Sequence, residues 1–314
     1  MSNFKFSLKD VKPGACPYLI FNLACCLDEY IIWGLTVLSL GIRPLSRGDE
    51  MRLEKKIAVI TGAGRGIGES IAHAFADEGA ELILTARTRQ QLDRVAGDIK
   101  AKNRHAAAIT CDVSSPKEVE NLAAEVRDKF GRVDILVNNA GISRRSKLLD
   151  YDDDTWLEVI RVNLFGVYLC SKAFLPIMQT KGEGRIINMA STAGKSPVPF
   201  NTAYSASKHG VLGFTKSLAS EVAVSGYPGI TVNAVCPFFV DTDMFRGPQG
   251  YLAQIAKLAG VSEKDVEEKV VGRSLQKRVL EPAEVAAMAV YLASADGRGI
   301  TGQAINICGG RIFH

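Results

Sequence analysis

From Met51 onward the chain alternates short, apolar, β-rich runs with stretches of helical periodicity, and this alternation constrains the fold more than any other feature. Consecutive strands that are joined by crossover helices lie parallel, and a parallel sheet is covered by helices on both faces. The strand-like runs are KIAVIT (56–61), ELILTA (81–86), HAAAIT (105–110), VDILVN (133–138), RIINMA (185–190), ITVNAV (230–235) and QAINIC (303–308). We therefore predict an α/β fold with a doubly wound, seven-stranded parallel sheet in a single domain.

Helical patterns fill the intervals between these runs, and one interval is unusually long. The patterns cover about 67–79, 89–102, 116–129, 153–180, 203–225 and 282–293. Residues 243–278 form a further helical insertion between the last two strands. Insertions of this size in a compact domain usually have a function, so we predict a substrate lid at 243–278 whose apolar residues suit a hydrophobic substrate end.

The first fifty residues differ from the rest of the chain. The stretch 15–42 is strongly apolar, but Asp28 and Glu29 divide it into runs shorter than the ~20 residues that a spanning helix needs. It also lacks the features of a secretory signal, and MRLEKKIAVITGAG from Met51 reads as a natural start. We predict that 1–50 is an extension outside the fold, either a mis-assigned start or a weak membrane anchor, and that 51–314 is the folded domain.

Charge, cysteine and histidine placement exclude several classes of protein. The net charge of +4 is small for 314 residues and the basic residues are dispersed, so we expect no nucleic-acid partner. An odd number of cysteines without CxxC spacing argues against a disulfide framework and favours a reducing, cytoplasmic setting. His73, His105, His209 and His314 show no metal-ligand spacing, so no metal is predicted. The cysteines are Cys16, Cys25, Cys26, Cys111, Cys170, Cys236 and Cys308.

A glycine-rich turn, TGAGRGIG (61–68), follows the first strand and opens a helix. Glycines at such a turn let backbone amides and the helix N-terminus face a pyrophosphate. The spacing of Gly62, Gly66 and Gly68 is not GxGxxG, so the general dinucleotide motif is not met. It is TGxxxGxG.

This signature resembles that of the short-chain dehydrogenase/reductase family. The resemblance continues with NNAG (138–141), Asn163, Ser191 and YSASK (204–208), and it covers about 51–310. The sequence is most similar to bacterial 3-oxoacyl-thioester reductases and polyketide ketoreductases, including a C-terminal NICGG. The resemblance implies a Rossmann fold and a homotetramer in which the 153–180 and 203–225 helices pack across subunits.

The end of the second strand, LTARTRQ (84–90), bears on the choice of cofactor. An NAD enzyme places an acidic residue about here to bind the adenosine ribose hydroxyls, whereas Ala86 stands here, with Arg87 next and Arg65 in the glycine turn. Two guanidinium groups suit the 2′-phosphate of NADP(H), although either arginine alone fits a solvated surface equally well. We predict NADP(H).

The resemblance implies the remaining cofactor contacts residue by residue. Asp112 resembles the residue that contacts adenine, and Asn138 begins the segment that lines the adenosine side. The predicted cofactor-binding residues are Gly62, Arg65, Gly66, Ile67, Gly68, Arg87, Asp112, Val113, Asn139, Ala140, Gly141, Tyr204, Lys208, Pro237, Val240 and Thr242.

Tyr204 and Lys208 are four residues apart at a helix start, so their side chains share one face. A phenol is a poor base at neutral pH, and a nearby ammonium stabilises its phenolate and lowers its pKa. The resemblance implies that Tyr204 exchanges a proton with the carbonyl oxygen and that Lys208 also holds the nicotinamide ribose. It further implies that Ser191 orients the carbonyl and that Asn163 helps a water relay protons.

The reaction implied by the resemblance is reduction of a ketone by NADPH, with a 3-oxoacyl thioester as the leading substrate. The carrier-protein-facing arginines of fatty-acid-synthesis reductases align near Pro176 and Ser225, and neither position is basic. Arg144, Arg145 and Lys147 form either another anionic docking site or a solvated basic loop. An acyl-carrier-protein ester, a coenzyme A ester and a small or polyketide-like ketone all remain open, as do an idle NADP-binding sensor and a membrane-associated protein that uses 15–42.

Phe238 departs from the family pattern. The family usually has Pro-Gly where this chain has Pro237 and Phe238, followed by Val240 and Thr242 beside the nicotinamide carboxamide. The Phe238 ring either narrows a nicotinamide-adjacent pocket or packs under the lid.

Overall fold

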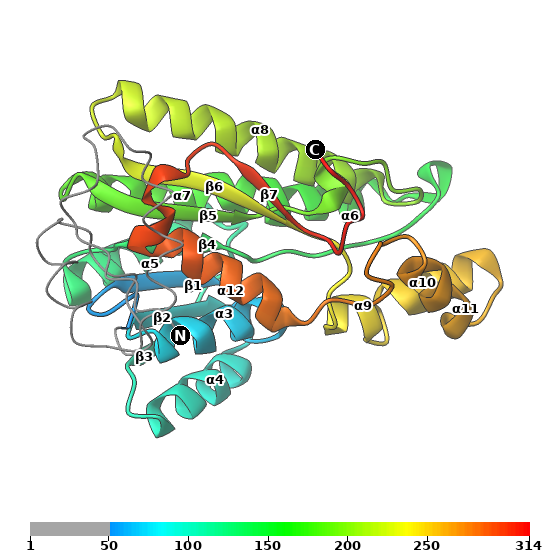
Figure 1. Ribbon diagram of the computed structural model, residues 1–314, viewed down its shortest axis with the longest axis horizontal. Coiled ribbons are helices and arrows are strands. Elements are labelled where there is room, and N and C mark those ends of the chain that lie inside the picture. The colour runs from blue at the N-terminus through cyan, green and yellow to red at the C-terminus, as the bar shows by residue number, and fades with distance from the viewer. Residues whose placement is uncertain (1–50) are drawn as a thin grey trace, which may run out of the picture. The chain divides into compact units, whose positions relative to one another are not determined.

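The computed structural model describes residues 51–314, so the apolar stretch 15–42 and the cysteines before Met51 lie outside the described residues. All seven strands pair in parallel, in the order β3-β2-β1-β4-β5-β6-β7 (Figure 1). This is the strand order of a doubly wound Rossmann sheet, which confirms the predicted fold class. The strands are β1 (Ile57–Thr61), β2 (Glu81–Ala86), β3 (Ala106–Thr110), β4 (Ile135–Asn138), β5 (Glu183–Met189), β6 (Gly229–Pro237) and β7 (Ala304–Ile307).

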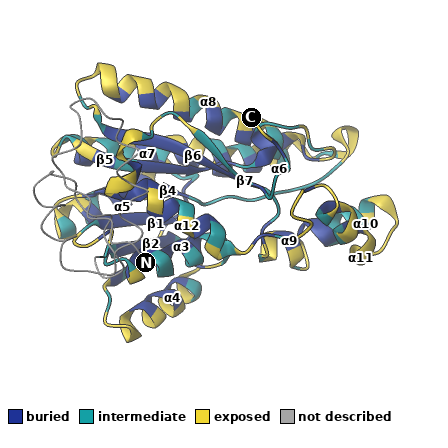
Figure 2. Cartoon of the chain, viewed as in Figure 1, coloured by how far each residue is buried: buried dark blue, intermediate teal, exposed yellow. Residues whose placement is uncertain are grey.

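Helices cover both faces of the sheet, which explains why the central strands read as continuous apolar runs. All five residues of β1 are buried. One hydrophobic cluster joins the sheet to α3 (Gly66–Asp77), α4 (Arg89–Ala101) and α12 (Pro282–Ala293). The other joins it to α5 (Pro116–Phe130), α7 (Gly166–Gln179) and α8 (Thr202–Val224). Figure 2 shows the sheet buried between the two layers and the outer faces of the helices exposed.

The local sequence explains where α5 begins and ends. The Ser115 side chain caps α5 by accepting a hydrogen bond from the Glu118 amide, and Pro116 occupies the first turn. Gly131 ends the same helix in the left-handed conformation, which glycine adopts without a steric penalty. The bounds of α5 therefore follow from capping residues at both of its ends.

The predicted helix 153–180 is interrupted. It consists of α6 (Asp153–Ile160), a π-helical turn (Arg161–Phe165) and α7. By length and composition alone, with a mean hydropathy of 1.3, Asp153–Gln179 could cross a membrane. It packs instead within the fold, where α7 contacts β4 and β5. Short 3-10 turns lie at Leu148–Asp150, Thr192–Gly194 and Ala295–Gly299.

The insertion between β6 and β7 is helical, as predicted for 243–278. It contains α9 (Asp243–Arg246), α10 (Tyr251–Ala259) and α11 (Glu263–Val271). The last of these begins with a capping box between Ser262 and Asp265. The insertion has a small core of its own and extends past the carboxyl ends of the strands (Figure 1).

Candidate active site

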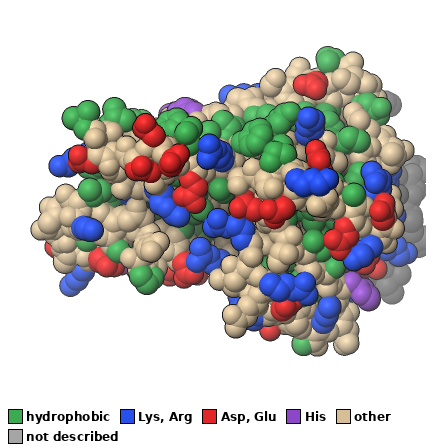
Figure 3. All heavy atoms as spheres, turned by 180° about the vertical axis from the view of Figure 1, so that it is seen from behind, with side chains coloured by type: hydrophobic (Ala, Val, Ile, Leu, Met, Phe, Trp, Pro, Cys, Tyr) green, Lys and Arg blue, Asp and Glu red, His purple; other side chains and the backbone are tan. Residues whose placement is uncertain are grey.

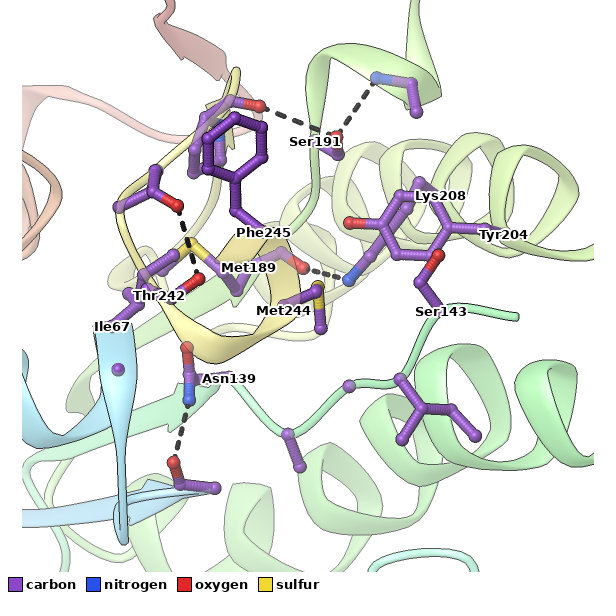
Figure 4. A pocket seen from close by; sticks show the side chains of 18 of the residues that line it. Ile67, Asn139, Ser143, Met189, Ser191, Tyr204, Lys208, Thr242, Met244 and Phe245 are labelled. Carbon is purple, nitrogen blue, oxygen red and sulfur yellow. Dashed lines mark hydrogen bonds between the residues drawn. The ribbon is translucent and has the colours of Figure 1, made fainter. Parts of the chain in front are cut away.

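A cavity of about 330 Å³ lies at the carboxyl ends of the strands, where ligands bind in doubly wound sheets. The loops after β1, β4, β5 and β6, the start of α8 and the first residues of the insertion line it (Figure 4). Most of the predicted site residues meet here. Those that line it are Gly62, Arg65, Gly66, Ile67, Arg87, Asp112, Val113, Asn139, Ala140, Gly141, Ser191, Tyr204, Lys208, Pro237, Val240 and Thr242.

Each of the three glycines in the first loop is required for a structural reason of its own. Gly62 and Gly66 have φ values of 65° and 58°, a region that side chains with a Cβ rarely adopt. A Cβ on Gly62 would also lie 2.9 Å from the Ala140 Cα. Gly68 does not line the cavity: a Cβ there would overlap the Gly62 carbonyl, so this glycine lets α3 pack closely against the loop.

Two polar side chains tie the loop after β4 to the glycine loop. Thr61 Oγ1 accepts from the amides of Asn139 and Ala140, each at 3.0 Å. The Asn139 side chain donates to the Thr61 carbonyl at 3.0 Å and to the Gly62 carbonyl at 3.2 Å. Figure 4 shows Asn139 at the cavity wall. The Asn138 side chain instead faces the core and donates to Asn188 Oδ1 at 2.8 Å, so the lining segment begins at Asn139 rather than at Asn138.

The chemistry-bearing end of the cavity contains a tyrosine and a buried lysine. Tyr204 and Lys208 lie in the first two turns of α8, and Lys208 Nζ is 5.5 Å from the centroid of the Tyr204 ring. Lys208 Nζ donates to the Met189 carbonyl at 2.6 Å. Burial lowers the pKa of Lys208 to about 8, because desolvation disfavours the charged ammonium.

The pKa of Tyr204 is raised, contrary to the expected effect of the nearby lysine. Burial raises it, and this outweighs the opposing effects of the Ser191 hydroxyl and the Arg145 guanidinium. Tyr204 is therefore protonated at neutral pH, which is the state that a proton donor requires.

Ser191 lies two residues beyond the end of β5, directly before the 3-10 turn Thr192–Gly194, and near Tyr204 in Figure 4. Its Oγ accepts from the Ala193 amide at 3.1 Å and donates to the Pro237 carbonyl at 3.5 Å. These two contacts fix the hydroxyl at the cavity wall, where a carbonyl oxygen that reaches Tyr204 would also meet Ser191.

Asn163 supports the cavity from behind rather than lining it. It is fully buried in the π-helical turn, and its Nδ2 donates to Ser207 Oγ at 3.1 Å as well as to the Ile142 carbonyl. The interrupted helix thus places an amide behind the loop that follows β4. Sequence periodicity did not predict this interruption.

Known proteins resemble the chain over nearly all of the described residues. The family model described as short chain dehydrogenase matches residues 56–249. A protein of Streptomyces violaceoruber assigned as ketoacyl reductase 1 of the granaticin polyketide synthase is 42% identical over 258 residues, which are 82% of this chain and 93% of that protein. The 3-oxoacyl-[acyl-carrier-protein] reductase of Vibrio cholerae is 38% identical over 260 residues, 83% of this chain and 98% of that one.

The chain belongs to the short-chain dehydrogenase/reductase family. A crystal structure of a variant of actinorhodin polyketide ketoreductase with NADPH matches with a TM-score of 0.77 and 39% identity, covering 82% of this chain and 97% of that one. The predicted family membership is confirmed.

The adenosine end of this reductase cavity fits NADP(H). Ala86 stands at the end of β2 where an NAD enzyme would place an acid, and Arg65 and Arg87 line the cavity nearby. Arg65 Nη1 lies 3.2 Å from Asp243 Oδ2, and both side chains are largely exposed, so this ion pair is weak and can open for a phosphate. The protein is accordingly an NADP(H)-dependent oxidoreductase.

For Phe238 the sequence allowed two positions, beside the nicotinamide or under the lid. Phe238 lines the cavity and also packs edge-on against Phe239, with ring centroids 4.5 Å apart, so it belongs to both the cavity wall and the base of the insertion.

Arg145 is not part of a solvated basic loop, which was one of the two interpretations of its sequence context. Its guanidinium lines the cavity and lies 4.3 Å from the centroid of the Tyr251 ring.

Within residues 51–314 no group of His, Cys, Asp and Glu side chains is arranged to hold a metal ion. The four cysteines there, Cys111, Cys170, Cys236 and Cys308, are free and buried.

Proposed function

We propose that the protein reduces the ketone of a 3-oxoacyl thioester to a secondary alcohol. The observation that carries the proposal is the placement of Tyr204 beside the buried Lys208 in the cavity, which Ser191 also lines. Bound NADPH supplies the hydride to the carbonyl carbon. The names of the relatives, ketoacyl reductase and 3-oxoacyl-[acyl-carrier-protein] reductase, support this reaction.

The catalytic roles divide among the residues at this end of the cavity. Tyr204 Oη donates its proton to the carbonyl oxygen, and Ser191 Oγ hydrogen-bonds the same oxygen and orients it. The Lys208 ammonium stabilises the phenolate that remains and is placed to hold the nicotinamide ribose. Asn163 positions the loop after β4 through Ile142, and the predicted proton relay through a bound water belongs to the same proposal.

The cofactor would be held at the other end of the cavity. The glycine loop and the N-terminus of α3 face the pyrophosphate, since Gly62 and Gly66 leave the loop backbone unobstructed. Arg65 and Arg87 bind the 2′-phosphate, Asp112 and Val113 contact the adenine, and Thr242 contacts the carboxamide.

The carrier of the acyl group in this thioester is coenzyme A or an acyl-carrier protein. A small or polyketide-like ketone is the second candidate, and the absence of a basic side chain at Pro176 and Ser225 favours it over a carrier-protein ester. The aromatic residues at the base of the insertion, Phe239, Phe245 and Tyr251, fit a hydrophobic substrate end in either case.

An NADPH-depletion assay tests the proposal. The purified protein is mixed with NADPH and with acetoacetyl-CoA, longer 3-oxoacyl thioesters or simple ketones. Faster turnover of thioesters than of simple ketones supports the leading substrate, and the reverse order supports the second candidate. Binding of NADPH without turnover of any ketone would identify the protein as an idle NADP-binding sensor.

We propose that the enzyme is a cytoplasmic homotetramer. Leu157, Phe165 and Tyr168 are exposed on α6, the π-helical turn and α7, where the family resemblance places subunit contacts. Figure 3 shows a band of hydrophobic side chains on one face, with basic and acidic side chains interspersed rather than gathered into a basic patch. Light scattering after size-exclusion chromatography measures the number of subunits.

A separate experiment tests the weak membrane anchor. The full chain and a chain that begins at Met51 are each mixed with lipid vesicles, and the fraction of protein that sediments with the vesicles is compared.

A further inference from the structure

The loop that follows β4 inserts an arginine into the part of the cavity where the ketone is proposed to react. Arg145 lines the cavity together with Ser143, Asn201 and Tyr204. Its guanidinium stacks on Tyr251, the first residue of α10. When the Asn201 amide is oriented to donate to the Arg144 carbonyl at 3.0 Å, its oxygen accepts from Arg145 Nη2 at 3.1 Å. Arg145 is thus held between the insertion and the start of α8.

This guanidinium has no counter-charge among residues 51–314. Its Nε and Nη1 are buried without a hydrogen-bond partner there. Burial lowers the pKa of Arg145 to about 10, and the nearby groups that oppose this are tyrosine hydroxyls, so the side chain remains a cation at neutral pH. Burying a cation without a partner is unfavourable, and a perturbed charged group in a cleft is a candidate for binding a ligand.

The cavity lining contains further cations. Arg273 and Arg311 also line the cavity. The carboxylates that line it within residues 51–314 are Asp112, which follows β3, and Asp243, which pairs with Arg65. Both belong to the proposed cofactor end. The N-terminus of the long helix α8 adds a partial positive charge near Tyr204.

We propose that Arg145 forms an anion-binding subsite beside Tyr204 and selects substrates that carry a carboxylate on the ketone-bearing part of the molecule. The inference rests on the proposed function only in placing the ketone at Tyr204. The phosphates of coenzyme A and of a pantetheine arm are separated from the thioester by the length of the arm, so they do not reach this wall when the ketone is at Tyr204.

The carboxylate has two possible sources. It is the C1 carboxylate of a free 3-oxo acid, or it lies at the far end of the acyl chain of a 3-oxoacyl thioester. Both present a planar anion that matches the fork of a guanidinium. Two substrate pairs separate them: acetoacetate with methyl acetoacetate, and the N-acetylcysteamine thioesters of 3-oxoadipate and 3-oxohexanoate. Because N-acetylcysteamine is uncharged, the test carboxylate is the only anion in the second pair.

The experiment measures kcat/KM for NADPH-dependent reduction of each pair by the wild-type protein, Arg145→Gln and Arg145→Lys. Arg144→Gln is the matched control, since this neighbouring arginine is half-exposed and lies 3.7 Å from Glu158. Each preference is a ratio measured on one variant, so loss of folded protein cancels. The same pairs are titrated calorimetrically into the complex with NADP+, which gives a readout that does not depend on turnover.

We expect the wild-type protein to prefer the anionic member of one pair by about 10- to 100-fold, the contribution of a hydrogen bond to a charged group. Arg145→Gln abolishes the preference, Arg145→Lys retains part of it, and Arg144→Gln keeps it. Equal use of both members by the wild-type protein, or an unchanged preference in Arg145→Gln, overturns the proposal.

Reduction of acetoacetate with neither thioester reduced refutes the thioester function and leaves the anion subsite standing. If nothing is turned over, the titrations decide: Arg145-dependent binding of an anionic member supports the subsite, and its absence rejects it.

Discussion

The side-chain amide of Asn163 and the backbone of Ile142 bond to each other in both directions. Asn163 Oδ1 accepts from the Ile142 amide at 2.8 Å, and Nδ2 donates to the Ile142 carbonyl at 2.9 Å. One buried side chain thereby replaces a strand partner for the loop after β4, which carries Gly141, Ser143 and Arg145 into the cavity. The position of this cavity wall depends on the pair.

Asn163→Ala is therefore expected to lower both stability and activity. It leaves the Ile142 amide and carbonyl without partners in the interior, and each such group costs about 1–3 kcal/mol. We expect the free energy of unfolding in urea to fall by about 2 kcal/mol or more. Asn121→Ala, at an exposed position in α5, is the control. An Asn163→Ala protein as stable as this control would show that the paired hydrogen bonds contribute nothing.

The preference for NADPH over NADH is expected to depend on Arg65 and Arg87. Each charge-assisted hydrogen bond to the 2′-phosphate contributes about 1.5–3 kcal/mol, so the double change to Ala raises the KM for NADPH by about 100-fold or more. The KM for NADH stays nearly constant because NADH has no 2′-phosphate. Arg89→Ala, which removes an exposed arginine paired with Asp93, controls for a general loss of positive charge. Equal increases for both cofactors would refute the phosphate assignment.

The pH dependence of kcat/KM is expected to follow the titration of Lys208. Because burial lowers its pKa to about 8, the ammonium loses its proton as the pH rises through about 8, while the raised pKa of Tyr204 keeps the phenol protonated. We expect kcat/KM for NADPH to fall with increasing pH above about 8.

The lowered pKa of Lys208 is expected to affect stability in the opposite direction from activity. Between about 8 and 10.5 the unfolded chain binds the Lys208 proton more strongly than the folded one, so this group's contribution to stability increases with pH across that window. A kcat/KM profile that stays flat until the protein unfolds would contradict an essential role for the charged lysine.

Phe238→Gly is expected to widen the range of ketones that the enzyme reduces. The ring lines the cavity and contacts Phe239, so its removal enlarges the space next to the nicotinamide site and loosens the base of the insertion. We expect kcat/KM for bulky ketones to rise relative to that for acetoacetyl-CoA, with Phe238→Leu intermediate. An unchanged substrate profile with a lower melting temperature would show that the ring serves only to pack under the insertion.

The sequence was sufficient wherever local periodicity and spacing decide the structure. Buried runs such as β1 are apolar throughout because helices cover both faces of the sheet, and the prediction of seven parallel strands follows from that. Tyr204 and Lys208 meet because they are four residues apart in α8, which begins within a residue of the predicted start.

Features that depend on contacts between distant segments were not predictable in this way. The π-helical turn at Arg161–Phe165 contains Asn163, whose hydrogen bonds with Ile142 and Ser207 join segments that are distant in sequence, and no periodicity predicts them. From sequence, Arg145 could equally be a solvated loop residue. Its contact with Tyr251 joins two segments that are far apart in the chain, so no local pattern predicts it. The pKa of Tyr204 likewise depends on burial, which outweighs its neighbours.

The rate of NADPH oxidation by Tyr204→Phe tests the central claim most directly. The change removes only the hydroxyl that donates the proton, and Tyr291→Phe, at an exposed position on α12, is the matched control. With the best ketone substrate, we expect Tyr204→Phe to lose about 100- to 10,000-fold in kcat, the contribution of general acid catalysis, while fluorescence titration shows nearly unchanged NADPH binding. Turnover by Tyr204→Phe at the rate of the control would contradict the assignment of Tyr204 as the acid.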